Sequence, residues 1–261
     1  MTVAGELVDR IGVRLHPTRN DTAILPMSPA VVRDGEILVA AMMLAADISS
    51  GIRLHEPGVT RVLTTAFSLR RATNGFVGPI TATSTRLFAA SRRFVDRLAF
   101  HDDSGELVAT GRISFVVHRG DESPRDARSR YLTPWTQPIQ QSLIDAAGIE
   151  VSDHATGRVT MSVSDDVKRD GEIVQGSFVT LLGEASALAL AEHTYGAPAV
   201  VESLDVEFLA GVADAVTTEA RWLAAAGDSD IEVVLRSDAS SEALAVFIIG
   251  CSPIGHRRKS F

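Results

Sequence analysis

An internal repeat constrains the fold of this chain more than any other feature. The segment Val31–Ile37 (VVRDGEI) returns 136 residues later as Val167–Ile173 (VKRDGEI). Without gaps, Leu7–Leu38 and Leu143–Val174 are identical at 10 of 32 positions. A repeat of this length indicates the duplication of one folding unit. We therefore expect two similar units within the 261 residues, not one large domain.

A polar stretch separates the two copies. Residues 120–137 contain Gly120, a run of charged residues, and Pro124 and Pro134. Segments rich in such residues connect domains more often than they enter sheets. The sequence thus predicts an N-terminal domain at 1–119, a linker at 120–137 and a C-terminal domain at 138–261.

Each copy continues with the same order of elements. A segment rich in Ala, Leu and Met follows the shared turn, at Val39–Leu54 and again at Gly176–Tyr195, and favours a helix buried on all sides. Alternating β-type segments come next. They are Arg61–Arg70, Pro79–Phe88, Arg93–His101 and Glu106–His118 in the first half, and Ala199–Leu209, Ala215–Leu223, Asp230–Arg236 and Ala243–Gly250 in the second. This pattern predicts an α+β fold of two antiparallel sheets, each wrapped around a long central helix.

Composition and motifs exclude several classes of protein. A net charge of -8 argues against a nucleic-acid partner. No apolar run is long enough to cross a membrane, and Met1–Arg10 has no apolar signal region, so we expect a cytoplasmic protein without a membrane partner. A single Cys251 allows no internal disulfide. The chain has no nucleotide-binding glycine motif and no metal-ligand spacing, so no cofactor and no metal are expected.

The start of each long helix resembles a known family. In the second half Gln175-Gly176 opens the helix and Glu184 follows nine residues after Gln175; in the first half Asp47 follows nine residues after Leu38. Together with the duplication, this resembles hotdog-fold thioesterases of the PaaI-like and 4-hydroxybenzoyl-CoA type. Their helices open with His-Gly-Gly or Gln-Gly-Gly and carry such a carboxylate. The resemblance implies a tandem double hotdog that hydrolyses acyl-CoA thioesters.

The resemblance also implies a composite active site. In dimers of this family the oxyanion donors and the carboxylate come from opposite subunits, so a fused pair would join Asp47 to Gln175 and Gly176. Thr64, on the strand after the first helix, matches a Ser or Thr that assists the carboxylate in relatives. Thioester hydrolysis needs a carboxylate to attack the carbonyl or to activate water, and backbone N–H donors for the oxyanion.

The second composite site is predicted to be degenerate. It would join Glu184 to Val39 and Ala40, where the first half has no polar side chain, and Glu202 stands near the position that corresponds to Thr64. Glu184 nevertheless remains a candidate catalytic residue. Structural roles stay open for four of the five candidates, Asp47, Glu184, Gln175 and Thr64. A carboxylate can be an ion-pair partner, a glutamine can be a polar residue at a helix start, and a strand threonine can be an ordinary β-branched residue.

Two other functions remain open beside an acyl-CoA thioesterase. One is an acyl-CoA-binding protein without turnover, because half one lacks the helix-start donors. The other is an enoyl-CoA hydratase, although the Asp-x-Asn-Pro-x-His motif of such enzymes is absent. The expected partners are an acyl-CoA substrate and further copies of the chain in a homo-oligomer of double hotdogs. Basic residues at the cleft mouth are candidates for binding coenzyme A phosphates. They are Arg33, Arg70, Arg71, Arg92 and Arg93.

Overall fold

The computed structural model describes residues 7–55, 59–73, 75–119, 131–132, 139–169, 173–223 and 230–255. Of the predicted linker 120–137, only Tyr131 and Leu132 are among them, so the linker lies outside the described residues apart from these two. The domain boundaries therefore remain a prediction.

Two long helices form the centre of the molecule. Helix α2 (Val39–Gly51), continued by the short 3₁₀ turn η1 (Ile52–Leu54), has every residue buried. Helix α5 (Gly176–Tyr195) buries 15 of its 20 residues. Both helices match the ranges predicted from composition, and their burial on all sides is confirmed. The short helices α1 (Leu7–Ile11) and α4 (Leu143–Ala146) lead into the two copies.

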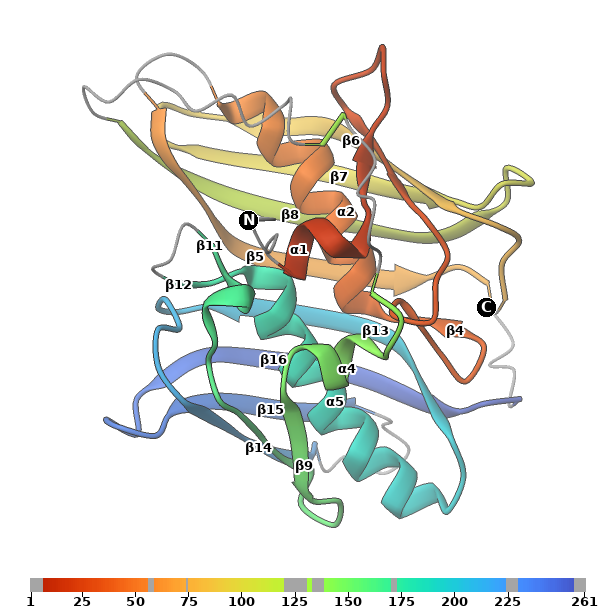
Figure 1. Ribbon diagram of the computed structural model, residues 1–261, viewed down its shortest axis with the longest axis vertical. Coiled ribbons are helices and arrows are strands. Elements are labelled where there is room, and N and C mark those ends of the chain that lie inside the picture. Colours follow the sequence, from red (N-terminus) through yellow and green to blue (C-terminus); the bar gives the residue numbers. More distant parts are fainter. Residues whose placement is uncertain are drawn as a thin grey trace, which may run out of the picture.

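A single antiparallel sheet of twelve strands wraps around both helices (Figure 1). Its order is β1-β2-β6-β7-β8-β5-β13-β16-β15-β14-β10-β9, so each half contributes six strands. The first six are β1 (Arg14–Leu15), β2 (Thr22–Leu25), β5 (Val59–Arg71), β6 (Ile80–Ala89), β7 (Arg93–His101) and β8 (Leu107–Arg119). The second six are β9 (Ile149–Asp153), β10 (Arg158–Met161), β13 (Ala199–Phe208), β14 (Val216–Trp222), β15 (Asp230–Ser237) and β16 (Ala243–Pro253). All eight predicted long strands are present.

The two predicted sheets join edge to edge. Strand β5 pairs with β13 from Ala66↔Glu207 to Arg70↔Ser203, and we call this pairing the seam. Next to it, α2 and α5 pack against each other, and Thr180 Oγ1 donates to Met43 Sδ at 2.8 Å. Met43 and Thr180 hold the same place in the two copies, so the halves are related by an approximate twofold axis that passes between them.

A small hairpin precedes each long helix. Strands β3 (Val32–Arg33) and β4 (Glu36–Ile37) enclose Asp34 and Gly35, both at positive φ, as a two-residue hairpin turn requires. In the second copy β11 (Lys168–Arg169) and β12 (Ile173–Val174) are separated by one residue more. From this hairpin on, equivalent residues of the two copies are 137 positions apart instead of 136. Leu38 is therefore equivalent to Gln175, and Asp47 to Glu184.

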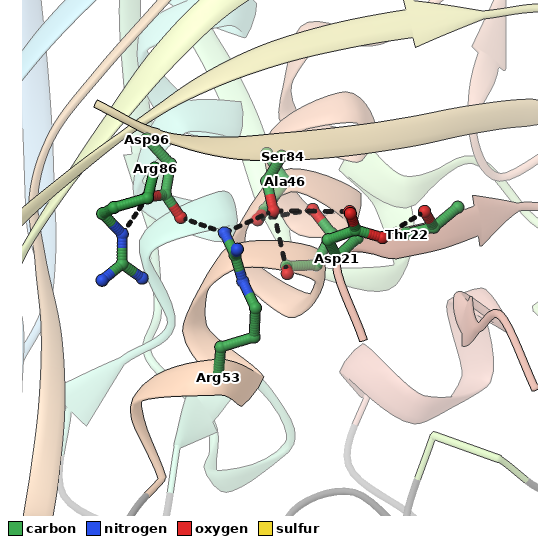
Figure 2. A network of polar contacts seen from close by, with 8 residues as sticks. Asp21, Thr22, Ala46, Arg53, Ser84, Arg86 and Asp96 are labelled. Atoms are coloured by element: carbon green, nitrogen blue, oxygen red, sulfur yellow. Dashed lines mark hydrogen bonds and ion pairs between the residues drawn. The ribbon is translucent and has the colours of Figure 1, made fainter. Parts of the chain in front are cut away.

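A buried polar network fixes the carboxyl end of α2 (Figure 2). Asp96 of β7 is fully buried and accepts hydrogen bonds from Arg53 Nη2 at 2.7 Å and from Arg86 Nε. Arg53 also donates to Ser84 Oγ at 2.9 Å, and Ser84 Oγ donates to the carbonyl oxygen of Ser49 at 3.0 Å. The network ties α2 to β6 and β7, and thereby sets the position of the helix that carries Asp47.

Replacing Asp96 tests how much this network contributes. In Asp96→Ala, two arginines that are about one quarter exposed lose their shared buried anion. The variant should lose about 2–3 kcal/mol of unfolding free energy in urea titrations, the range for charge-assisted bonds with buried partners. Asp214→Ala serves as the matched control, because Asp214 is exposed and makes no such bond to the described residues; the variant should lose less than about 0.5 kcal/mol. Equal losses in both variants would contradict this role.

Cys251 offers a second check on the core. Its thiol is fully buried in β16, and burial raises its pKa far above the usual range. Because the thiolate is the reactive form, the native protein should not react with an exposed-thiol reagent over hours, while one equivalent should react in denaturant. Rapid stoichiometric labelling of the native chain would show that this part of the core is wrong.

Candidate active site

A cavity of about 320 Å³ lies at one end of the seam, where β13 stops pairing with β5. It is bounded by β5, by the start of α5 and by the segment that follows β13. That segment is held in place by a hydrogen bond from Val174 N to the carbonyl oxygen of Val212, at 2.7 Å. The lining is mostly apolar; its polar members are Asp47, Thr64, Thr65, His118 and Gln175, with Gly176 beside them.

The structure brings together all four residues predicted for the first composite site. Thr64 Oγ1 donates to Asp47 Oδ1 at 2.7 Å, and Gln175 Nε2 donates to Asp47 Oδ2 at 3.0 Å. Asp47 is only 8% exposed and Gln175 only 6%. The carboxylate is thus held on both oxygens, once from its own half and once from the other half of the chain.

Local structure explains how each side chain is aimed. Gln175 caps the start of α5, where its Oε1 accepts from Ser177 N at 2.6 Å and from Ser177 Oγ. Since Oε1 is committed to the helix, Nε2 must point the other way, toward Asp47. A β-bulge lies directly after Thr64, between Thr64 and Ala66, and bulges re-aim neighbouring side chains.

Gly176 supplies an unoccupied backbone donor beside this carboxylate. Within the described part of the chain its amide N–H makes no hydrogen bond, while the next amide, Ser177 N, is taken by Gln175. The first N–H groups of a helix point outward and carry its positive end. A Cβ on Gly176 would lie 3.1 Å from Met43 Cε, so there is little room for a larger residue at this position.

The second composite site has the predicted members but a different arrangement. Glu184 Oε1 accepts from Val39 N at 2.8 Å, and Glu184 Oε2 accepts from Ala40 N at 2.9 Å. Both helix-start donors of α2 are therefore occupied by the carboxylate itself, which is 2% exposed. Burial raises the pKa of Glu184, and the amides of Ala40 and Val39 and the Arg71 cation act in the opposite direction.

An arginine occupies the space next to Glu184. Arg71 is the last residue of β5, and its counterpart Phe208 is the last residue of β13. Phe208 lines the cavity, whereas the Arg71 side chain is only 2% exposed. It donates to the carbonyl oxygens of Val201, at 2.6 Å, and of Ile37, and lies 3.3 Å from Glu36. Burial lowers its pKa, and the nearby Glu36, Glu184 and Glu202 raise it. The guanidinium thus remains the shared cation of three carboxylates.

This arrangement corrects one prediction on the arginines. Arg71 cannot bind a coenzyme A phosphate, because it is buried and its donors are committed. Arg33 pairs with Glu192 at 2.8 Å, and Arg70 pairs with Asp205 across the seam. Arg92 and Arg93 are exposed at the start of β7.

Two features were not predicted from the sequence. One is the cap that Glu184 forms at the start of α2, and the other is the burial of Arg71. For Arg71 a signal was available: alternation along β5 puts it on the same face as the buried Phe67 and Leu69, where a charge needs a partner. For Glu184 there was no such signal, since only coordinates show that its side chain reaches the amides of α2.

Among the described residues, no group of three or more histidine, cysteine or acidic side chains is placed to hold a metal ion. None of the helices in that part of the chain is long and apolar enough to cross a membrane.

No protein-family model and no curated protein match this chain. Solved structures do. A tesB protein from Mycobacterium avium subsp. paratuberculosis matches with a TM-score of 0.65 and 13% identity, over 94% of this chain and 96% of that chain. An acyl-ACP thioesterase from Bacteroides thetaiotaomicron gives 0.62 and 9%, over 88% and 97%. A protein of unknown function with a hot dog fold from Alicyclobacillus acidocaldarius gives 0.59 and 16%, over 95% and 98%.

These matches span nearly the whole chain. The matched structures therefore share both halves of the duplicated arrangement, and not only one of them. The chain has the hotdog fold, present twice in one polypeptide and closed into a single sheet. The double hotdog predicted from the sequence is confirmed.

Glu184→Gln tests the structural role of the second carboxylate. A glutamine amide presents only one acceptor, so one of the two α2 amides would lose its partner and face an NH₂ group. The variant should lose about 1–3 kcal/mol of unfolding free energy, the cost of an unsatisfied buried donor. Unchanged stability in urea titrations would show that these two bonds do not fix the start of α2.

Proposed function

We propose that the chain is a thioester hydrolase that cleaves acyl-CoA to the free acid and the thiol at one composite site. The observation that carries this proposal is the Asp47 carboxylate, held by Thr64 and Gln175 inside an apolar cavity, beside the unoccupied Gly176 amide. An apolar cavity with a few convergent polar groups is the usual form of a site for a small organic ligand.

The chemistry follows from these positions. The Asp47 carboxylate orients a water molecule toward the thioester carbon. Asp47 takes a proton as the water oxygen attacks, and the negative charge that develops on the carbonyl oxygen is stabilised by the Gly176 N–H at the start of α5. The C–S bond then breaks, and Asp47 returns the proton to the sulfur. Thr64 and Gln175 keep the carboxylate oriented throughout.

We assign the second site a structural role. Because Glu184 occupies the α2 amides and Arg71 fills the neighbouring space, neither a free donor nor an accessible carboxylate is left there. Glu184, a catalytic candidate on sequence grounds, is in this proposal the cap of α2. One active site per chain follows.

The fold neighbours support thioester chemistry in general terms. The Bacteroides protein is called an acyl-ACP thioesterase, and an acyl-CoA thioesterase II from Mycobacterium marinum matches with a TM-score of 0.56 and 11% identity. They do not favour the PaaI-like or 4-hydroxybenzoyl-CoA type over other hotdog thioesterases. We therefore propose the reaction class and leave the acyl group open.

The test is hydrolysis of a panel of acyl-CoA thioesters, followed by detection of the released thiol. Asp47→Asn should lower kcat by about 10²–10⁴-fold, the usual contribution of a general base. Thr64→Val should lower kcat by a smaller factor, because one of the two bonds that orient Asp47 remains. The matched control is Glu184→Gln, which changes the corresponding carboxylate of the other helix and should keep its rate at temperatures where it is folded.

Four outcomes would contradict the proposal. Full activity of Asp47→Asn would remove the carboxylate from the mechanism. Loss of activity in folded Glu184→Gln would move the reaction to the second site. Tight binding of acyl-CoA by the wild type without release of thiol would favour the acyl-CoA-binding alternative, and loss of enoyl absorbance with a crotonyl thioester would favour the hydratase.

A further inference from the structure

Two buried side chains meet where the central helices pack against each other. Met43 of α2 and Thr180 of α5 hold equivalent places in the two copies, and neither is exposed to solvent. Thr180 Oγ1 donates to Met43 Sδ at 2.8 Å, and we call this contact the hydroxyl–thioether pair. Because one copy has a methionine where the other has a threonine, the contact at the twofold axis is not symmetric.

The hydroxyl group of Thr180 is directed away from its own helix. A threonine inside a helix can donate to the carbonyl oxygen four residues earlier, as Thr194 Oγ1 does to Leu190 at 2.8 Å. For Thr180 that carbonyl oxygen belongs to Gly176, the first residue of α5. Such a bond often bends a helix, and here it would act on the first turn. Donation to Met43 avoids this bend.

Met43 in turn packs against Gly176. Its Cε lies 3.1 Å from the position that a Cβ on Gly176 would take, and Phe208 Cζ lies 3.7 Å from that position. A glycine has wide backbone freedom and no side chain that could hold it in place. Methionine is also flexible, since its side chain has three rotatable bonds. The bond from Thr180 restricts Met43, so its methyl group can hold the Gly176 backbone in one position.

The position of Gly176 matters because of its backbone N–H. An oxyanion donor is effective when it already points to the place where the negative charge develops. Within the described part of the chain, no hydrogen bond fixes the Gly176 N–H. Packing against the glycine backbone must therefore fix its direction.

We propose that Met43 and Thr180 are positioning residues for the Gly176 N–H. This inference rests on the thioester hydrolysis proposed above and adds two residues to that site, neither of which lines the cavity. Thr180 holds the sulfur of Met43, and Met43 holds the glycine from which the donor projects. In the other copy Val39 is equivalent to Gly176, and there Glu184 holds the N–H directly.

The first test is kinetic. Thr180→Val removes the hydroxyl group from a side chain of the same shape, and Met43→Leu removes the sulfur at nearly constant volume. Each should lower kcat for acyl-CoA hydrolysis by about tenfold and leave KM within about twofold, because a misdirected donor weakens transition-state binding only. The double variant should lose no more than the larger single loss, since the pair acts as one unit. Thr194→Val, which removes a hydroxyl group bonded within the same helix, is the matched control and should keep kcat.

The second test does not depend on turnover. The ¹⁵N order parameter of the Gly176 amide, measured by NMR relaxation on glycine-labelled protein, should be near the rigid-backbone value of about 0.85 in the wild type and in Thr194→Val. It should fall clearly in Thr180→Val and in Met43→Leu. Gly183, inside α5, is the internal reference and should stay unchanged in all four proteins.

The two tests separate this inference from the proposed function. A wild type that hydrolyses no acyl-CoA would overturn the proposed function, and the order parameters would still decide whether the hydroxyl–thioether pair holds Gly176. An unchanged Gly176 order parameter in both single variants would overturn the inference. Wild-type kcat in Thr180→Val, losses that multiply in the double variant, or an equal loss of kcat in Thr194→Val would also overturn it.

Discussion

The structure depends on how two buried carboxylates are satisfied. The two central helices carry a buried acidic residue at equivalent places, Asp47 in α2 and Glu184 in α5. An unpaired charge in an apolar interior would cost several kcal/mol. Because the halves are related by an approximate twofold axis, the start of the other helix supplies the donors in both cases. Asp47 meets the side chain of Gln175, and Glu184 meets the backbone amides of Val39 and Ala40.

The side chains of Asp47 and Glu184 differ in length by one methylene group, and this difference accounts for their different partners. The longer Glu184 reaches the α2 amides itself and closes them, while the shorter Asp47 is bridged by the Gln175 amide and leaves the Gly176 N–H unoccupied. The other neighbours of the two carboxylates also differ. Thr64 binds Asp47, and the buried Arg71 with its own acidic partners stands next to Glu184. The duplication thus provided two equivalent positions, and one became a cavity while the other became an ionic part of the core.

The cavity belongs to the pair of halves and not to either one. Asp47 and Thr64 come from the first half, and Gln175, Gly176 and the segment after β13 come from the second. The seam between β5 and β13 holds them in register. Separation of the halves would remove the donors from the carboxylate, so neither half alone contains the complete composite site.

Periodicity and the repeat predicted the helices and the long strands, because helix burial and strand alternation are local properties. The first composite site was predicted from the resemblance to hotdog thioesterases, in which the carboxylate and the helix-start donors come from opposite halves. The single sheet was not predicted, since edge pairing of β5 with β13 depends on long-range register. The role of Glu184 was also missed, because the reach of one side chain across the twofold axis is a matter of a few ångströms. Arg71 shows an intermediate case: its core-facing position was visible in the sequence, but its partners were not.

We propose that only one of the two equivalent positions holds an open site. A crystal structure with a non-hydrolysable acyl-CoA thioether ketone tests it most directly, because both positions are seen in one experiment. We expect one ligand per chain, with its carbonyl oxygen within hydrogen-bond distance of Gly176 N and next to Asp47, and with Glu184 still bonded to the α2 amides. A ligand carbonyl at Val39 and Ala40, with Glu184 displaced, would contradict it.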